Sequence, residues 1–165
     1  MNKQLFSNEE LMGFLHEIPD PEIPVIDIVE LGVIREINAL EKSIEVTITP
    51  TYSGCPAMKQ MEDDIKKKLS EKGYKEVKIK TIFNPPWTTD WITEEAKEKL
   101  NKYGIAPPEH SSIDKAVLLG KERIVKCPRC ASTNTKIISQ FGSTACKALY
   151  QCSDCLEPFD YFKCI

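Results

Sequence analysis

The chain has 165 residues, 41% of them hydrophobic, which suits one ordinary domain or a small domain joined to a metal-stabilised module. No apolar run approaches the ~18 residues of a membrane span, and the first ten residues lack the apolar stretch of a signal peptide. We therefore expect a cytoplasmic protein with reduced thiols and no membrane partner.

Charge is distributed unevenly along the chain. Residues 1–105 carry 14 Lys and Arg against 19 Asp and Glu, a net charge of −5, whereas residues 106–165 carry 8 against 6, a net charge of +2. A Zn²⁺ ion held by four thiolates would bring the second part to about zero. Because neither part has the basic surface that nucleic-acid binding usually requires, we expect no nucleic-acid partner.

An amphipathic helix is predicted near the start of the chain. Ser7 and Glu10 have the spacing of a capping box, and apolar residues recur at helical spacing over residues 8–17. Two prolines then end the helix, since proline cannot continue it. A stiff acidic loop follows over residues 20–24.

The middle of the chain alternates between strand-like and helix-like patterns. In chain order, these patterns predict strands over 32–37 and 44–48, a helix over 56–72, a strand over 77–82 and a helix over 93–103. Trp87 and Trp91, just before the last helix, are expected to pack in the interior; a partner-binding patch is the alternative. This order predicts an α+β fold: a small α/β sandwich with a mixed sheet of about three strands and about three helices.

The C-terminal part contains two C-x-x-C pairs, formed by Cys127, Cys130, Cys152 and Cys155. Two residues between cysteines let one tight turn direct both sulfurs toward one point, and two such turns supply a tetrahedral zinc site. The 21 residues between the pairs slightly exceed the usual spacing. Strand-like stretches between and after the pairs predict a β zinc ribbon that needs the metal to fold. Disulfides, a redox dithiol and an iron–sulfur cluster are the alternatives.

These patterns divide the chain into an α/β domain over residues 1–105, a linker over 106–123 and a zinc ribbon over 124–165. Cys146 and Cys164 lie outside the two pairs. Either is a possible alternate metal ligand, but we expect both to be buried apolar residues, because the pairs already satisfy the metal.

One cysteine, Cys55, lies in the predicted α/β domain, far from the ribbon in the sequence. Pro56 favours the first position of a helix, so we expect Cys55 at the N-cap, where the helix macrodipole favours a thiolate. Thr51 is placed to donate a hydroxyl hydrogen bond to its sulfur. A buried, inert cysteine is an equally open alternative. No histidine is near in sequence, so a lone thiolate suits transient binding of iron or a cluster better than nucleophilic catalysis.

The acidic loop supplies two further candidates, Asp20 and Glu22. Both could face a metal or act as general bases. Acidic residues in proline-rich loops more often cap turns, and we favour that interpretation.

Three motifs together resemble the small α/β iron–sulfur cluster assembly family. They are the D-P-E loop over residues 20–24, the segment over 27–34 and the T-x-x-x-C-P helix cap over 51–56. The resemblance covers residues 8–103. It implies that Cys55 is a transient ligand of iron or a cluster, with Thr51, Asp20 and Glu22 around it.

The segments over 141–150 and 156–164 make the resemblance more specific. They are similar to the D subunits of bacterial ring 1,2-phenylacetyl-CoA epoxidases, in which the assembly domain is fused to a zinc ribbon. The resemblance implies an accessory role in aerobic phenylacetate degradation. The chain would mature iron or iron–sulfur centres of the oxygenase or reductase, together with iron–sulfur assembly proteins.

The implied cofactors are a structural zinc ion and a transient iron–sulfur cluster or iron. A structural subunit that bridges the oxygenase and the reductase is the alternative function. Because no active-site chemistry is visible in the sequence, we expect an accessory subunit rather than a catalyst.

Overall fold

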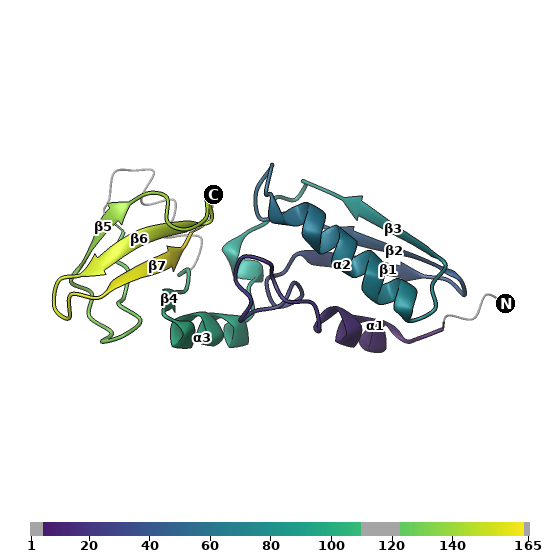
Figure 1. Ribbon diagram of the computed structural model, residues 1–165, viewed down its shortest axis with the longest axis horizontal. Helices are drawn as coiled ribbons and strands as arrows, with labels where there is room; N and C mark the ends of the chain where they lie inside the picture. The colour runs from purple at the N-terminus through teal and green to yellow at the C-terminus, as the bar shows by residue number, and fades with distance from the viewer. Residues whose placement is uncertain (1–4, 110–122, 164–165) are drawn as a thin grey trace. The chain divides into compact units, whose positions relative to one another are not determined.

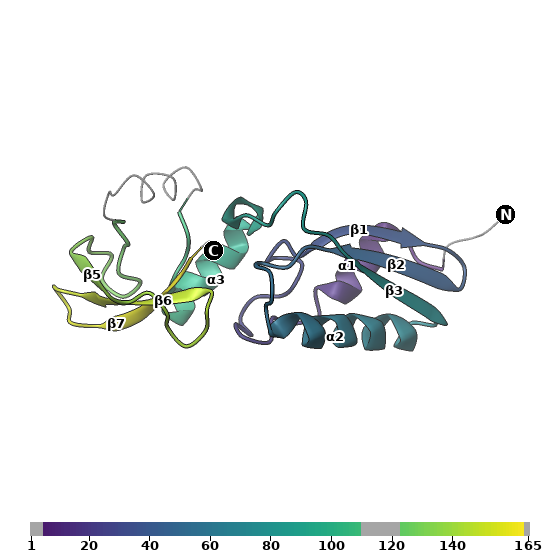
Figure 2. The same cartoon turned by 90° about the horizontal axis from the view of Figure 1, so that it is seen from above.

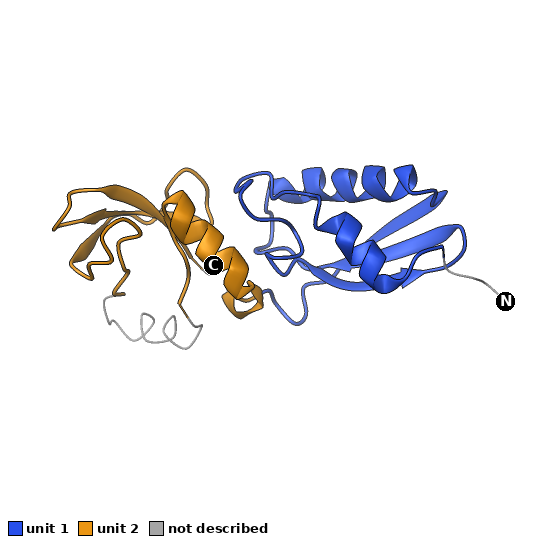
Figure 3. Ribbon diagram, turned by 90° about the horizontal axis from the view of Figure 1, so that it is seen from below, with its two compact units in different colours: residues 1–87 blue, residues 88–165 orange. Residues whose placement is uncertain are grey.

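The structure is a computed structural model that describes residues 5–109 and 123–163. The chain separates into two compact units, residues 1–87 and residues 88–165 (Figure 3). This division lies earlier than the predicted limit at residue 105, because a short strand after the last helix pairs within the second unit. Most of the predicted linker falls outside the described residues. The predicted domain limits say which parts of the chain fold independently, and they stay a prediction.

Unit 1 is a three-stranded mixed sheet with two helices. Its elements are α1 (Asn8–Leu15), β1 (Ile34–Ala39), β2 (Ser43–Ile48), α2 (Ala57–Glu71) and β3 (Glu76–Thr81) (Figure 1). The sheet order is β1-β2-β3, with β1 antiparallel and β3 parallel to β2. The helix α2 lies along one side of the sheet (Figure 2), and α1 packs beside α2. The predicted α+β fold is confirmed.

The core of unit 1 follows from the two periodicities predicted for its elements. Along β2, every second side chain is apolar and buried, whereas α2 buries residues at helical spacing. The buried residues of these two elements include Ile44, Val46, Ile48, Met61, Ile65 and Leu69. Trp87 also belongs to this core: it is 6% exposed, and its Nε1 donates to the Leu31 carbonyl at 2.9 Å. The packing role predicted for Trp87 is therefore confirmed.

Unit 2 combines a helical segment with the ribbon sheet. Its elements are η1 (Thr89–Trp91), α3 (Glu94–Tyr103), β4 (Ile105–Ala106), β5 (Thr135–Ser139), β6 (Lys147–Cys152) and β7 (Pro158–Phe162). The sheet order is β4-β7-β6-β5, with β4 parallel to β7 and the other neighbours antiparallel. The three ribbon strands lie where the sequence predicts them. The elements η1 and β4 were not predicted, since two or three residues are too short to show a period.

The ribbon core is small and aromatic. Tyr150 stacks on Phe159 and meets Tyr161 edge to face, with ring centroids 6.0 and 5.7 Å apart. Cys127 and Cys152 are buried in the same cluster. None of the helices within residues 5–109 and 123–163 is long and apolar enough to cross a membrane.

Candidate metal sites

Four sulfurs converge at one end of the ribbon sheet. The Sγ atoms of Cys127, Cys130, Cys152 and Cys155 all lie within 4.8 Å of one another. The distance is 3.7 Å from Cys127 to Cys155 and 3.6 Å from Cys130 to Cys152. Sulfurs placed ~2.3 Å from a zinc ion at tetrahedral angles are separated by about 3.8 Å. The four residues therefore fit a tetrahedral zinc ion.

The two C-x-x-C turns have the same backbone geometry. The Cys127 N–H donates to the carbonyl five residues later at 2.9 Å, and the Cys152 N–H does the same at 2.9 Å. The residue after each second cysteine is left-handed: φ is 60° at Ala131 and 64° at Leu156. Such φ values favour glycine, so both turns keep their shape at a steric cost.

Reciprocal polar contacts hold the two turns together. The third residue of the first turn, Arg129, pairs with Glu157, which follows the second turn. In return, Asp154 of the second turn accepts from Ser132, which follows the first turn, and from Asn134 Nδ2 at 2.8 Å. These contacts constrain the relative positions of the two cysteine pairs. Sequence reasoning did not single out these side chains, because their pairing depends on the fold.

The electrostatics of the cluster favour a bound cation. The backbone N–H of Cys155, assisted by that of Asp154, lowers the pKa of Cys152 to about 7. At Cys130 the Ser132 N–H acts in the same direction, but burial and the neighbouring thiols raise the pKa to about 12. Four touching sulfurs cannot all be thiolates without a positive charge among them, and a zinc ion supplies that charge.

Of the two remaining C-terminal cysteines, Cys146 lies within the described residues, and it does not join the cluster. Cys146 is buried at 6% exposure, and its sulfur lies 3.0 Å from the Thr144 hydroxyl. It is absent from the group of four sulfurs. Cys164, the other possible alternate ligand, lies outside the described residues.

Cys55 lies just before α2 in unit 1. Its side chain is buried, but polar groups surround the thiol. Cys55 is 9% exposed. The backbone N–H of Ala57 and the side chains of Tyr52 and Thr51 hydrogen-bond to its thiol, and Glu22 is close enough to act on its charge. Sequence reasoning did not single out Tyr52, although it lies in the same loop as Thr51.

Two predictions about Cys55 are wrong. The N-cap of α2 is Pro56, one residue later. Cys55 lies in the tight turn at the start of the helix, where its carbonyl accepts from the Met58 N–H at 3.2 Å. The pKa of the thiol is raised rather than lowered. Burial is the largest cause, and its effect, together with that of the Glu22 charge, exceeds the lowering by Ala57, Tyr52 and Thr51.

The acidic loop contributes its two residues in different ways. Asp20 is 4% exposed, and its Oδ1 accepts from the N–H groups of Glu22 at 2.9 Å and Ile23 at 2.7 Å. This carboxylate therefore caps the loop, which is the role that we favoured. The half-buried Glu22 is the member of the loop that acts on the Cys55 thiol.

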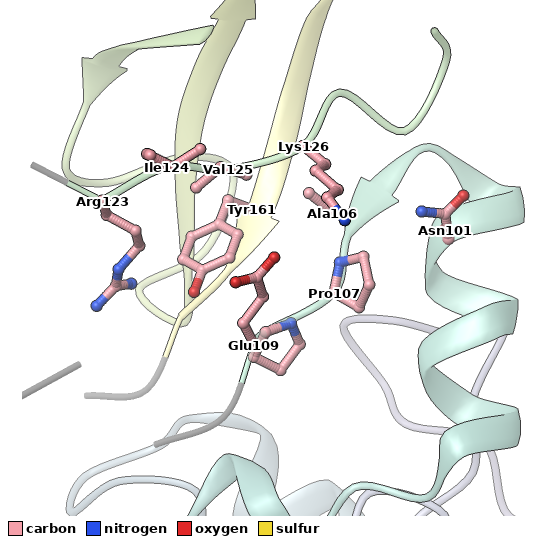
Figure 4. A pocket seen from close by; sticks show the side chains of 10 residues that line it. Asn101, Ala106, Pro107, Glu109, Arg123, Ile124, Val125, Lys126 and Tyr161 are labelled. Atoms are coloured by element: carbon pink, nitrogen blue, oxygen red, sulfur yellow. The ribbon is translucent and has the colours of Figure 1, made fainter. Parts of the chain in front are cut away.

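A cavity of about 230 Å³ lies elsewhere in unit 2. Arg123, Lys126, Tyr161 and Glu109 are among the side chains that line it (Figure 4). The Arg123 guanidinium lies over the Tyr161 ring, 5.0 Å from its centroid. The described residues that line it include no cysteine, so within unit 2 it differs from the group of four sulfurs.

Comparisons with known proteins agree with this two-part organisation. The family model "Iron-sulfur cluster assembly protein" matches residues 8–80, and "PaaD zinc beta ribbon domain" matches residues 111–163. A protein of Escherichia coli (strain K12), provisionally named as the D subunit of a 1,2-phenylacetyl-CoA epoxidase, is 48% identical over 156 residues. The alignment covers 94% of this chain and 92% of that protein.

Two further relatives match about half of the chain. The Fe-S protein maturation auxiliary factor YitW of Bacillus subtilis is 36% identical, over 54% of this chain and 88% of its own length. The crystal structure of a domain of unknown function, DUF59, from Bacillus anthracis is 34% identical, with a TM-score of 0.52. The match covers 56% of this chain and 89% of that chain.

Proposed function

The chain belongs to the family of D subunits of 1,2-phenylacetyl-CoA epoxidase, and from this premise we propose that it matures a metal centre of that epoxidase. Its relationship to Fe-S maturation factors gives it a role related to iron–sulfur assembly. In our proposal the chain delivers iron or an iron–sulfur cluster to the oxygenase or the reductase component. It is an accessory subunit and has no catalytic step of its own.

Cys55 carries this proposal, as the thiol that holds the cargo. It is the one described cysteine of unit 1, and hydrogen-bond donors from Ala57, Tyr52 and Thr51 converge on its sulfur. With a raised pKa it is a neutral thiol at pH 7, so a bound iron must displace the thiol proton. The nearby Glu22 carboxylate favours a cation at that position.

The small number of protein ligands explains why the binding would be transient. An iron–sulfur cluster usually binds four cysteine thiolates, whereas this site offers one sulfur and one carboxylate as ligands. The missing ligands would come from the donor or the client protein. Release then follows when the second protein offers a more complete set of ligands.

The ribbon holds a structural zinc ion, and we propose Cys127, Cys130, Cys152 and Cys155 as its four ligands. A closed set of four thiolates leaves no open position for a substrate. The zinc ion therefore stabilises the ribbon and takes no part in iron transfer.

The experiment uses a strain that makes the epoxidase but lacks this chain. Complementation with Cys55→Ser should fail to restore epoxidation, because an alcohol is a poor ligand for iron. Cys146→Ser is the matched control, since Cys146 is also buried but lies outside both sites. Immunoblots must show equal amounts of the two variants. Full activity with Cys55→Ser would instead favour the structural bridge between oxygenase and reductase.

A further inference from the structure

The strand β5 ends the ribbon sheet with an apolar surface. It pairs with β6 on one side and is the last strand in the order β4-β7-β6-β5. Its two isoleucines, Ile137 and Ile138, are 44% and 51% exposed, and the nearby Phe141 is 67% exposed. We call the surface formed by residues 136–139 and Phe141 the β5 edge.

The other long edge strands of the molecule are protected differently. In unit 1, β1 places Arg35 and Glu36 on its exposed positions, and β3 exposes Glu76, Lys78 and Lys80. Charges of this kind prevent an open edge from pairing with other chains. At the β5 edge only Lys136 and an irregularity in register between residues 137 and 139 serve that purpose. The exposed isoleucines are therefore a specific feature of β5.

Two lysines, Lys136 and Lys163, lie at the β5 edge. Of the described acidic residues of the ribbon, Glu157 pairs with Arg129 and Asp160 lies 3.9 Å from Lys147 Nζ, whereas Asp154 keeps its charge because its partners, Ser132 and Asn134, are neutral. Lys163 Nζ lies over the Phe141 ring, 4.2 Å from its centroid, which is within the range of a cation–π contact. Lys136 forms no ion pair within the described part of the chain. An acidic ligand would thus find cations beside an apolar strand.

We propose that the β5 edge docks an extended segment of a partner protein, in which apolar side chains alternate with acidic ones. Such a segment would add a fifth strand to the sheet, since open edges offer unpaired backbone groups and alternate side-chain positions. Its apolar side chains would cover Ile137 and Ile138, and its carboxylates would meet Lys136. A second copy of this chain fits less well, because it would bring a second Lys136 to the same edge. The inference goes beyond the proposed function, as it involves neither thiol site.

The test uses the full, zinc-loaded chain and a defined probe. The probe is a fluorescent ten-residue peptide in which valine alternates with glutamate between terminal serines, and a lysine version is its control. We expect saturable binding of the glutamate peptide, at least tenfold weaker binding of the lysine peptide, and amide chemical-shift changes concentrated in residues 135–141. Raising the salt concentration should weaken binding.

Two variants locate the site. Ile138→Glu should weaken binding of the glutamate peptide at least tenfold. Ile124→Glu is the control, because Ile124 is 64% exposed and lies outside β5. One zinc ion per chain in each variant shows that the ribbon is folded.

Several results would overturn the proposal: no binding, equal binding of both peptides, or equal effects of the two variants. A dimer in sedimentation that Ile138→Glu dissociates would assign the edge to a second copy and would also overturn it. Cys55→Ser should bind the peptide normally, so failure of the maturation role leaves this result unaffected.

Discussion

At the scale of single residues, the environment of Cys55 sets its chemistry. A thiol near a helix N-terminus is usually acidified, and the Ala57 N–H acts in that direction here. Burial outweighs this effect and raises the pKa. The resting thiol is therefore protonated, and in our proposal it becomes a ligand when a metal displaces the proton. This property suits a carrier that must not react with oxidants between transfers.

The pH dependence of Cys55 alkylation tests this assignment. Because only the thiolate reacts, the rate should rise with pH and reach half its maximum above 9.0, the ordinary thiol value. Mass spectrometry of the iodoacetamide-treated, zinc-loaded protein gives the rate at this site. A free cysteine peptide under the same conditions is the reference. A midpoint below that of the peptide would show that the helix N-terminus dominates over burial.

Ala131 offers a second test at a single residue. Its φ of 60° is strained for any residue with a Cβ, so Ala131→Gly should raise the free energy of unfolding of the zinc-loaded ribbon by about 0.5–1 kcal/mol. Ala145→Gly is the control, because Ala145 has an ordinary φ and should lose stability instead. Urea unfolding monitored by tyrosine fluorescence measures both. Equal changes in the two variants would contradict the strain argument.

Residue roles were predictable where they depend on neighbours in sequence. The loop-capping role of Asp20 and the capping box of Ser7 and Glu10 both follow from local spacing. The protonation of Cys55 was not predictable, because it depends on how deeply the fold buries the thiol. Local sequence shows the helix start but not the surrounding packing.

At the scale of elements, α1 depends strongly on its first turn. The Glu10 N–H donates to Ser7 Oγ at 3.2 Å, and the Ser7 N–H donates to Glu10 Oε2 at 2.8 Å. A helix of eight residues gains little from propagation, so these two bonds matter.

Removal of the cap should therefore destabilise unit 1. Ser7→Ala should lower its free energy of unfolding by about 1 kcal/mol. Ser70→Ala, at an exposed position inside α2, is the control and should change it by less than about 0.5 kcal/mol. Thermal unfolding followed by circular dichroism compares the two. An unchanged Ser7→Ala protein would show that packing alone holds α1.

The elements differ in how well the sequence predicts them. The boundaries of α2 and β3 agree with the prediction to within one residue. The agreement is close because apolar periodicity and Gly73 mark these boundaries in the sequence. The strand β4 has two residues and exists only through pairing with β7, which lies more than fifty residues later. Pairing between distant segments leaves no local signal.

At the scale of the whole molecule, the two units have different sources of stability. Unit 1 buries a continuous apolar core between its sheet and its helices. The ribbon has a small core, and two of its buried residues are cysteines of the metal cluster. A module of this size usually needs a metal to fold.

Zinc removal should thus separate the behaviour of the two units. Chelation under reducing conditions, or Cys152→Ser, should unfold the ribbon strands β5, β6 and β7. Unit 1 should keep its structure, and Cys55→Ser, the control, should leave the zinc content at one ion per chain. Amide resonances assigned to each unit report the outcome. Loss of structure in both units, or in neither, would contradict this division.

The organisation of the whole molecule was predictable in outline. The C-x-x-C spacing indicated the ribbon, and alternating strand and helix patterns indicated the α/β unit. The reciprocal contacts between the two cysteine turns were not predictable, because Arg129 and Glu157 meet only after both turns have formed.

We propose above all that this chain matures a metal centre of the epoxidase. The most direct measurement is the iron and acid-labile sulfide content of the purified oxygenase and reductase, each produced with and without this chain. We expect one component to lack iron in the absence of the chain, and we expect wild-type protein to restore the iron whereas Cys55→Ser does not. Full metal content in both components without the chain would contradict the maturation role.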